Sequence, residues 1–162
     1  MKTLMELFVH ELKDIYNAEN QILRALPKMI KKATSDKLRK GLEKHLQETE
    51  GQVERLEQIA EELDISLTGE HCKGMEGLLK EGDDVINERN EENLEDAAII
   101  GAAQKIEHYE ISTYTTLIKQ AELMDHKKAA KLLKQTLKEE ENADKTLAKI
   151  AEGEVAKKVV LH

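Results

Sequence analysis

The chain has 162 residues and a formal net charge of −8, with 36% charged and 40% hydrophobic residues. This length suits one domain with its own core, and the acidic balance argues against nucleic acid as a partner. Cys72 is the only cysteine, which excludes an intrachain disulfide and a cysteine metal cluster. No stretch has the pattern of a secretion signal or a membrane span, so we expect a soluble, cytoplasmic protein without a membrane partner.

Long stretches rich in Ala, Leu, Glu and Lys predict an all-α chain. The first helical segment runs from about Thr3 to Lys32 and places residues of one buried face at steps of three and four. Pro27 should kink this helix or end it early. The stripe is Leu4, Phe8, Leu12, Ile15, Glu19, Ile22, Leu26 and Met29.

The second segment runs from about Asp36 to Leu63, after a short polar break that offers N-cap residues. Its stripe contains three consecutive polar positions between leucines, which is unusual for a buried face. The stripe is Leu38, Leu42, His45, Glu48, Gln52, Leu56, Ile59 and Leu63.

Residues 64–90 break the helical pattern and contain four of the eight glycines. Apolar residues between Met75 and Ile86 predict a short helix within this insert. An insert of this length can carry the chain from one end of a helical bundle to the other.

The third segment runs from about Glu92 to Glu122 and the fourth from about Asp125 to Ala151, with fraying expected from Gly153 onward. The break between them is short, so these helices should be antiparallel neighbours. The third stripe is Ile100, Ala103, Glu107, Glu110, Tyr114, Leu117 and Ala121. The fourth is Ala129, Leu133, Thr136, Glu140, Asp144, Leu147 and Ala151.

Two helical hairpins joined by one long crossover predict a ferritin-like antiparallel four-helix bundle, with a short fifth helix in the crossover. We expect residues 1–162 to form this single domain. An up-down-up-down bundle with a flexible loop is the alternative topology.

Five acids occupy buried stripe positions close to the midpoints of the four long segments. When four similar helices pack side by side, their midpoints share a layer, so these side chains should converge. Buried carboxylates are costly unless they are paired or hold a metal, and oxygen ligands suit iron and manganese. The sequence therefore predicts a site for two metal ions. Its ligands are Glu19, Glu48, Glu107, Glu110 and Glu140.

Other polar residues on the stripes suggest support for this site. His45 lies one turn from Glu48 and is either a ligand or a hydrogen-bond partner of a carboxylate. Gln52 and Asp144 are expected to contact the ligands without binding metal. The alternative is a buried salt-bridge network in which Lys105 and Arg55 pair with the acids.

The string Glu107-His108-Tyr109-Glu110, followed by Tyr114, resembles the metal-binding third helix of rubrerythrins. Nearly the whole chain resembles the YciF-type bacterial stress-protein family, a ferritin-like group. Further matching stretches are His45-Leu46-Gln47-Glu48-Thr49 in the second segment, Lys73-Gly74-Met75-Glu76-Gly77-Leu78 in the crossover, and Glu139-Glu140 with Asp144 in the fourth. The resemblance implies a helical bundle, homodimerisation and expression under stress.

The chain departs from the usual ferritin-like pattern at two helices. Gly51 stands three residues after Glu48, and Ala143 three residues after Glu140, where Glu-x-x-His pairs would place histidines. The predicted site is therefore rich in carboxylates.

Two functions follow from these residues. The first is a dimetal protein, holding two iron ions or manganese, that oxidises ferrous iron or consumes peroxide. The second is a non-enzymatic, dimeric helical stress or scaffold protein whose acidic core holds no metal. Ile99, Ile106 and Ile118 lie outside the third stripe and suggest a second buried face for a partner.

Overall fold

The computed structural model describes residues 1–88 and 92–159. These residues form helices and connecting turns without any strand, which confirms the all-α prediction. The helices are α1 (Leu4–Lys32), α2 (Asp36–Leu63), α3 (Lys73–Asn87), α4 (Glu92–Leu123), α5 (Lys127–Ile150), a π-helical turn η1 (Ala151–Val155) and α6 (Ala156–Val159).

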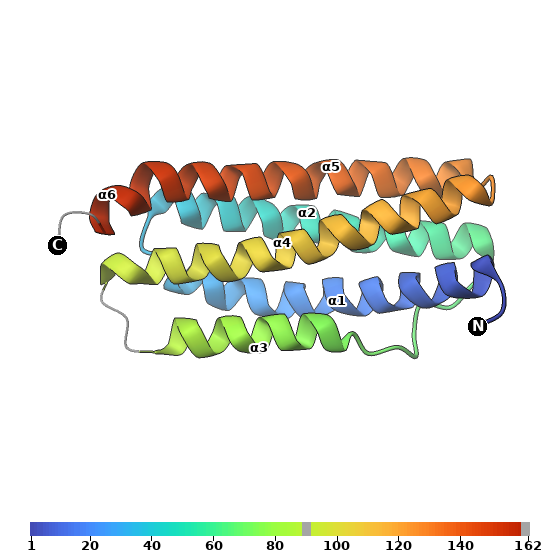
Figure 1. Ribbon diagram of the computed structural model, residues 1–162, viewed down its shortest axis with the longest axis horizontal. Helices are drawn as coiled ribbons and strands as arrows, with labels where there is room; N and C mark the ends of the chain where they lie inside the picture. The colour runs from blue at the N-terminus through green and yellow to red at the C-terminus, as the bar shows by residue number, and fades with distance from the viewer. Residues whose placement is uncertain (89–91, 160–162) are drawn as a thin grey trace.

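The four long helices lie side by side, and α3 lies along the outside against α1 and α4 (Figure 1). Helices α1 and α2 form one antiparallel hairpin, and α4 and α5 form the other. Helices α2 and α4 run in the same direction. After α2 ends, α3 carries the chain back along the outside of α1, so α4 begins near the end of the molecule where α2 began. The short helix predicted within the crossover is thus present, as α3.

A buried aspartate fixes the position of α4 relative to the first hairpin. Asp96 of α4 accepts hydrogen bonds from the backbone N–H (2.7 Å) and hydroxyl (2.7 Å) of Thr34 and from the backbone N–H of Ser35 (2.9 Å). The Ser35 hydroxyl in turn accepts from Leu38 N at 3.3 Å and caps α2. This anchor sets the register between α2 and α4, the helices that carry His45 and Glu107.

Two helix ends differ from expectation. Helix α1 does not stop at Pro27 but continues to Lys32. The end of the chain does not fray at Gly153, since η1 and α6 extend the helical structure to Val159. The Val155 side chain is buried, and both elements pack against α4, so tertiary contacts hold this segment.

The second apolar face of α4 is already covered within the chain. Ile99, Ile106 and Ile118 are all buried. Ile106 lines the same groove as Leu79 of α3, and α3 packs along this side of α4. The expectation that this face awaits a partner was wrong, because these three side chains are already buried within the chain.

Within the described part of the chain, each helix is either too short or too polar to cross a lipid bilayer.

Candidate metal centre

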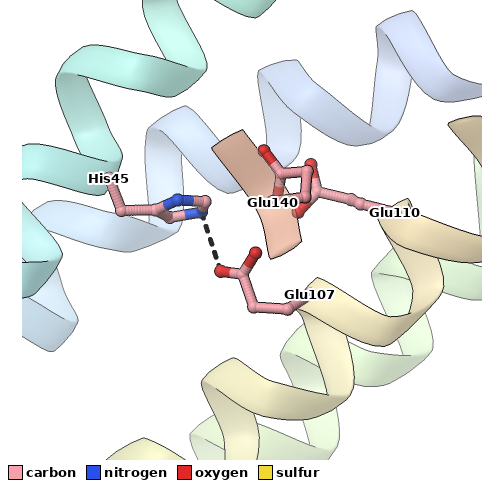
Figure 2. Close-up of side chains that lie close together, drawn as sticks. All are labelled: His45, Glu107, Glu110 and Glu140. Atoms are coloured by element: carbon pink, nitrogen blue, oxygen red, sulfur yellow. Dashed lines mark ion pairs between the residues drawn. The ribbon is translucent and has the colours of Figure 1, made fainter. Parts of the chain in front are cut away.

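Four buried side chains from three helices meet in the middle of the molecule. They are His45 of α2, Glu107 and Glu110 of α4, and Glu140 of α5. One nitrogen or oxygen atom from each lies within 4.8 Å of the others. Figure 2 shows the three carboxyl groups and the imidazole pointing toward one another. We call these four residues the acidic cluster.

The helical repeat explains why these positions converge. Glu107 and Glu110 are three residues apart and therefore lie on one face of α4. Buried apolar residues flank the polar ones along each helix, such as Leu42 and Leu56 on α2 and Leu133 and Leu147 on α5. The cluster is therefore one polar layer inside an apolar core.

Most polar atoms of the cluster have no hydrogen-bond partner within the described protein. His45 Nε2 lies 3.1 Å from Glu107 Oε1, but without the alignment of a hydrogen bond. The unpartnered atoms are both ring nitrogens of His45, Oε2 of Glu107, both carboxyl oxygens of Glu110 and Oε2 of Glu140. Buried polar atoms are rarely left in this state, and a bound cation would satisfy several of them together.

The carboxyl groups oppose one another's ionisation. Burial raises the pKa of Glu107 and Glu110 well above the usual range, and the negative charge of Glu140 raises both further. Without a metal, these acids therefore hold protons at pH values where an exposed glutamate is ionised. A divalent cation would displace those protons and remove the repulsion.

Glu19 of α1 lies beside the acidic cluster and is fully buried. Burial raises its pKa to about 8, and the charge of Glu140 acts in the same direction. Its Oε1 accepts a hydrogen bond from the Tyr114 hydroxyl, while its Oε2 has no partner.

Tyr114 is a contact to this site that the stripe pattern treated only as a core position. It lies four residues after Glu110, on the same face of α4, and its side chain is fully buried. A buried phenol usually needs a hydrogen-bond partner, and the nearest acidic layer could supply one. That requirement is a signal in the sequence from which this contact could have been predicted.

Gln52 and Asp144 have different relations to the cluster. The Gln52 side-chain amide donates a hydrogen bond to Oε1 of Glu140, so it orients one carboxylate. Asp144 instead lies 3.3 Å from His108 Nε2 and accepts from the Gln104 amide at 3.3 Å. Its charge still contributes to the raised pKa of Glu107.

Glu48 does not join the acidic cluster. The fully buried position on this turn of α2 is Thr49, whose hydroxyl donates to the His45 carbonyl at 2.8 Å. The Glu48 side chain is 19% exposed, and its Oε1 lies 3.4 Å from Lys44 Nζ. Its role as a metal ligand therefore stays a prediction.

The two cations of the salt-bridge alternative, Arg55 and Lys105, lie away from the acidic cluster. Arg55 donates to both carboxyl oxygens of Glu139 and to the Thr136 hydroxyl. Lys105 lies on the exposed side of α4. Within the described residues, neither side chain forms an ion pair with the acidic cluster.

Comparison with known proteins places the chain in a family. The family described as a domain of unknown function, DUF892, matches residues 3–160. The chain belongs to the DUF892 family. The chain is also similar to the Protein YciF of Escherichia coli (strain K12), with 45% identity over 159 residues, covering 98% of this chain and 96% of the relative. The YciF-type resemblance is thereby confirmed.

Solved structures extend the DUF892 likeness to the fold. The crystal structure of the E. coli stress protein YciF has a TM-score of 0.93 and 44% identity, over 97% of this chain and 99% of that one. The protein YcfI from Rhodopseudomonas palustris has a TM-score of 0.88 and 44% identity, covering 91% of this chain and 94% of that one. A protein from Xanthomonas campestris pv. campestris shares the fold, with a TM-score of 0.76, at 19% identity.

Proposed function

We propose that this homologue of a stress protein is a ferritin-like dimetal carboxylate protein, built as a single four-helix domain, that holds two iron ions or manganese. The supporting observation is the convergence of four buried ligand atoms within 4.8 Å, most of them without hydrogen-bond partners. A salt-bridge core would need cations, and the named candidates Arg55 and Lys105 do not reach it.

The residues of the acidic cluster, with Glu19 beside them, would hold the metal. Carboxylate oxygens and an imidazole nitrogen suit iron and manganese, and a carboxylate can bridge two ions because it has two oxygens. When bound, two ferrous ions would supply the two electrons that reduce one hydrogen peroxide, with two protons, to two waters.

The protein's own groups would prepare this site. The Gln52 amide holds one Glu140 oxygen, which directs the carboxylate without neutralising it. The Tyr114 hydroxyl does the same for Glu19. The surrounding apolar side chains lower the local dielectric around these residues, which would strengthen their attraction for a cation.

Cytoplasmic location and homodimerisation belong to the same proposal. The dimer is implied by the family resemblance. It would have to use a surface other than the α4 face that α3 covers.

Anaerobic titration with ferrous iron tests the proposal. We expect about two ions per chain, as in other dimetal bundles, and consumption of added peroxide by the loaded protein. Glu110→Gln keeps the shape of the side chain and should abolish binding of at least one ion. Glu141→Gln, which changes an exposed acid next to Glu140, is the control and should bind as the unaltered protein does.

The alternative function, a metal-free helical scaffold, predicts the opposite result. If the acidic core belongs to a metal-free scaffold, the unaltered protein will bind no iron above the level of Glu110→Gln, and peroxide will persist.

A further inference from the structure

A small cavity of about 30 Å³ opens beside the acidic cluster, between α2 and α5. Its inner wall includes the buried His45 and Glu107, and its outer wall includes Lys44 and Glu48. Lys44 is 71% exposed, so the lining of the cavity includes both a surface residue and residues of the acidic cluster. Its volume is sufficient for a water molecule.

The inner end of this cavity carries unsatisfied ligand atoms. Both ring nitrogens of His45 and Oε2 of Glu107 are buried without hydrogen-bond partners. Figure 2 shows these two side chains facing each other. An ion arriving through the cavity would therefore meet an imidazole and a carboxylate that lie 3.1 Å apart and whose Nδ1 and Oε2 atoms have no hydrogen-bond partner.

We propose that this cavity is the route by which a divalent cation reaches the acidic cluster, and that Glu48 is its receiving carboxylate at the surface. This inference rests on the proposed metal-binding function. It assigns Glu48 a binding position of its own, outside the cluster, where an incoming ion first exchanges water for carboxylate oxygen.

Lys44 controls access to that position. Its ammonium group lies 3.4 Å from Glu48 Oε1 and one helical turn away. Because the Lys44 side chain is 71% exposed, solvent screens this pair and the lysine is held only weakly. A doubly charged ion is attracted to the Glu48 carboxylate more strongly than the singly charged lysine is at the same distance, so it can displace the lysine.

The other half-buried acid near the cluster is less suited to this role. Asp144 is held by His108 and Gln104, and it does not line the cavity. Among the described residues that line the cavity, the acids are Glu48 and Glu107. Glu48 is thus the outer of two carboxylates on one path.

A residue on the route changes the rate of binding, whereas a ligand changes the affinity. We would measure Co²⁺, an air-stable substitute for the ferrous ion, by stopped-flow absorbance for rates and by calorimetry for the dissociation constant. Glu48→Gln should slow association and dissociation together by about fivefold to tenfold, because electrostatic attraction at the entrance is lost. The dissociation constant should stay within about twofold, since both rates pass the same barrier.

Lys44→Gln should act in the opposite direction and speed association severalfold, because Glu48 no longer has a competing cation. Matched controls are available on the same helix. Glu43→Gln and Lys40→Gln change net charge equally at exposed positions that do not line the cavity. Both should leave the rates close to those of the unaltered protein.

Three outcomes would overturn the inference. A tenfold weaker dissociation constant for Glu48→Gln with unchanged association would make Glu48 a ligand. Equal rates for Glu48→Gln and Glu43→Gln would leave only a net-charge effect. Absence of Co²⁺ binding by the unaltered protein would remove the proposed function as well, which the first two outcomes leave intact.

Discussion

Glu140 has one oxygen directed by Gln52 and the other without a partner. This arrangement shows how a single amide can orient a buried carboxylate. The amide donates a hydrogen bond but carries no charge, so it orients the carboxylate without removing its attraction for a cation. Gln52 is itself fully buried, which limits the rotamers available to it.

Replacing Gln52 by leucine should therefore weaken metal binding. We expect the dissociation constant for Mn²⁺ to rise about tenfold to a hundredfold, the usual effect of losing a partner that orients a ligand. Calorimetric titration would measure it. Asp144→Asn is the comparison. Asp144 contacts His108 and Gln104, so this change should affect the dissociation constant much less. Equal effects would contradict the assigned role of Gln52.

At the scale of the helix, α3 closes the side of the molecule that α4 leaves apolar. Its packing is closest at two glycines. A Cβ atom at Gly74 would lie 2.8 Å from the Tyr109 ring, and one at Gly82 would lie 3.1 Å from the Ala102 Cβ. The Tyr109 ring is held there by contacts from its hydroxyl to Asp14 Oδ2 and Cys72 Sγ, each at 3.1 Å.

Gly74 and Gly77 form a matched pair for testing this contact. Both lie in α3, but a Cβ atom at Gly77 would have no other atom within 4 Å. Gly74→Ala should lower the free energy of unfolding by about 1–3 kcal/mol, because the ring must move. Gly77→Ala should raise it by up to about 1 kcal/mol, from helix propensity alone. Urea unfolding would measure both, and the same sign for the two would refute the close packing.

For the whole molecule, the buried acids couple stability to pH. The pKa of Glu19 rises to about 8 in the folded chain, and those of Glu107 and Glu110 rise in the same direction. The folded protein thus binds more protons than the unfolded chain above pH 4.5, the ordinary value for glutamate. The free energy of unfolding must then fall as pH rises toward 8.

Metal-free protein should accordingly lose stability between pH 5 and pH 8. Glu19 alone can contribute up to about 3–4 kcal/mol to this loss. Urea unfolding in the presence of a chelator would show it, and Glu19→Gln should flatten the profile. Added Mn²⁺ should stabilise more at pH 8 than at pH 5, because it binds the deprotonated ligands. Rising stability of the metal-free protein over this range would contradict the proton-holding core.

The sequence by itself determined the helices, most of their buried positions and the presence of acids within them. These depend on local spacing, which the helical repeat converts directly into faces. For this reason the spacing alone could place Glu107 and Glu110 on the same buried face of one helix. Glu48 could not be separated from Thr49, because steps of three and four after His45 are both compatible with a stripe. The packing of α2 against its neighbours selected Thr49 for the interior.

Only the tertiary structure decided which partners the polar residues find. The Tyr114 hydroxyl of α4 donates a hydrogen bond to Glu19 of α1, and Arg55 of α2 donates to Glu139 of α5. Helix α3 packs against the second apolar face of α4. Each of these depends on the rotation and register of one helix against another. Side chains far apart in the chain set that geometry together, and the spacing within any one segment does not contain it.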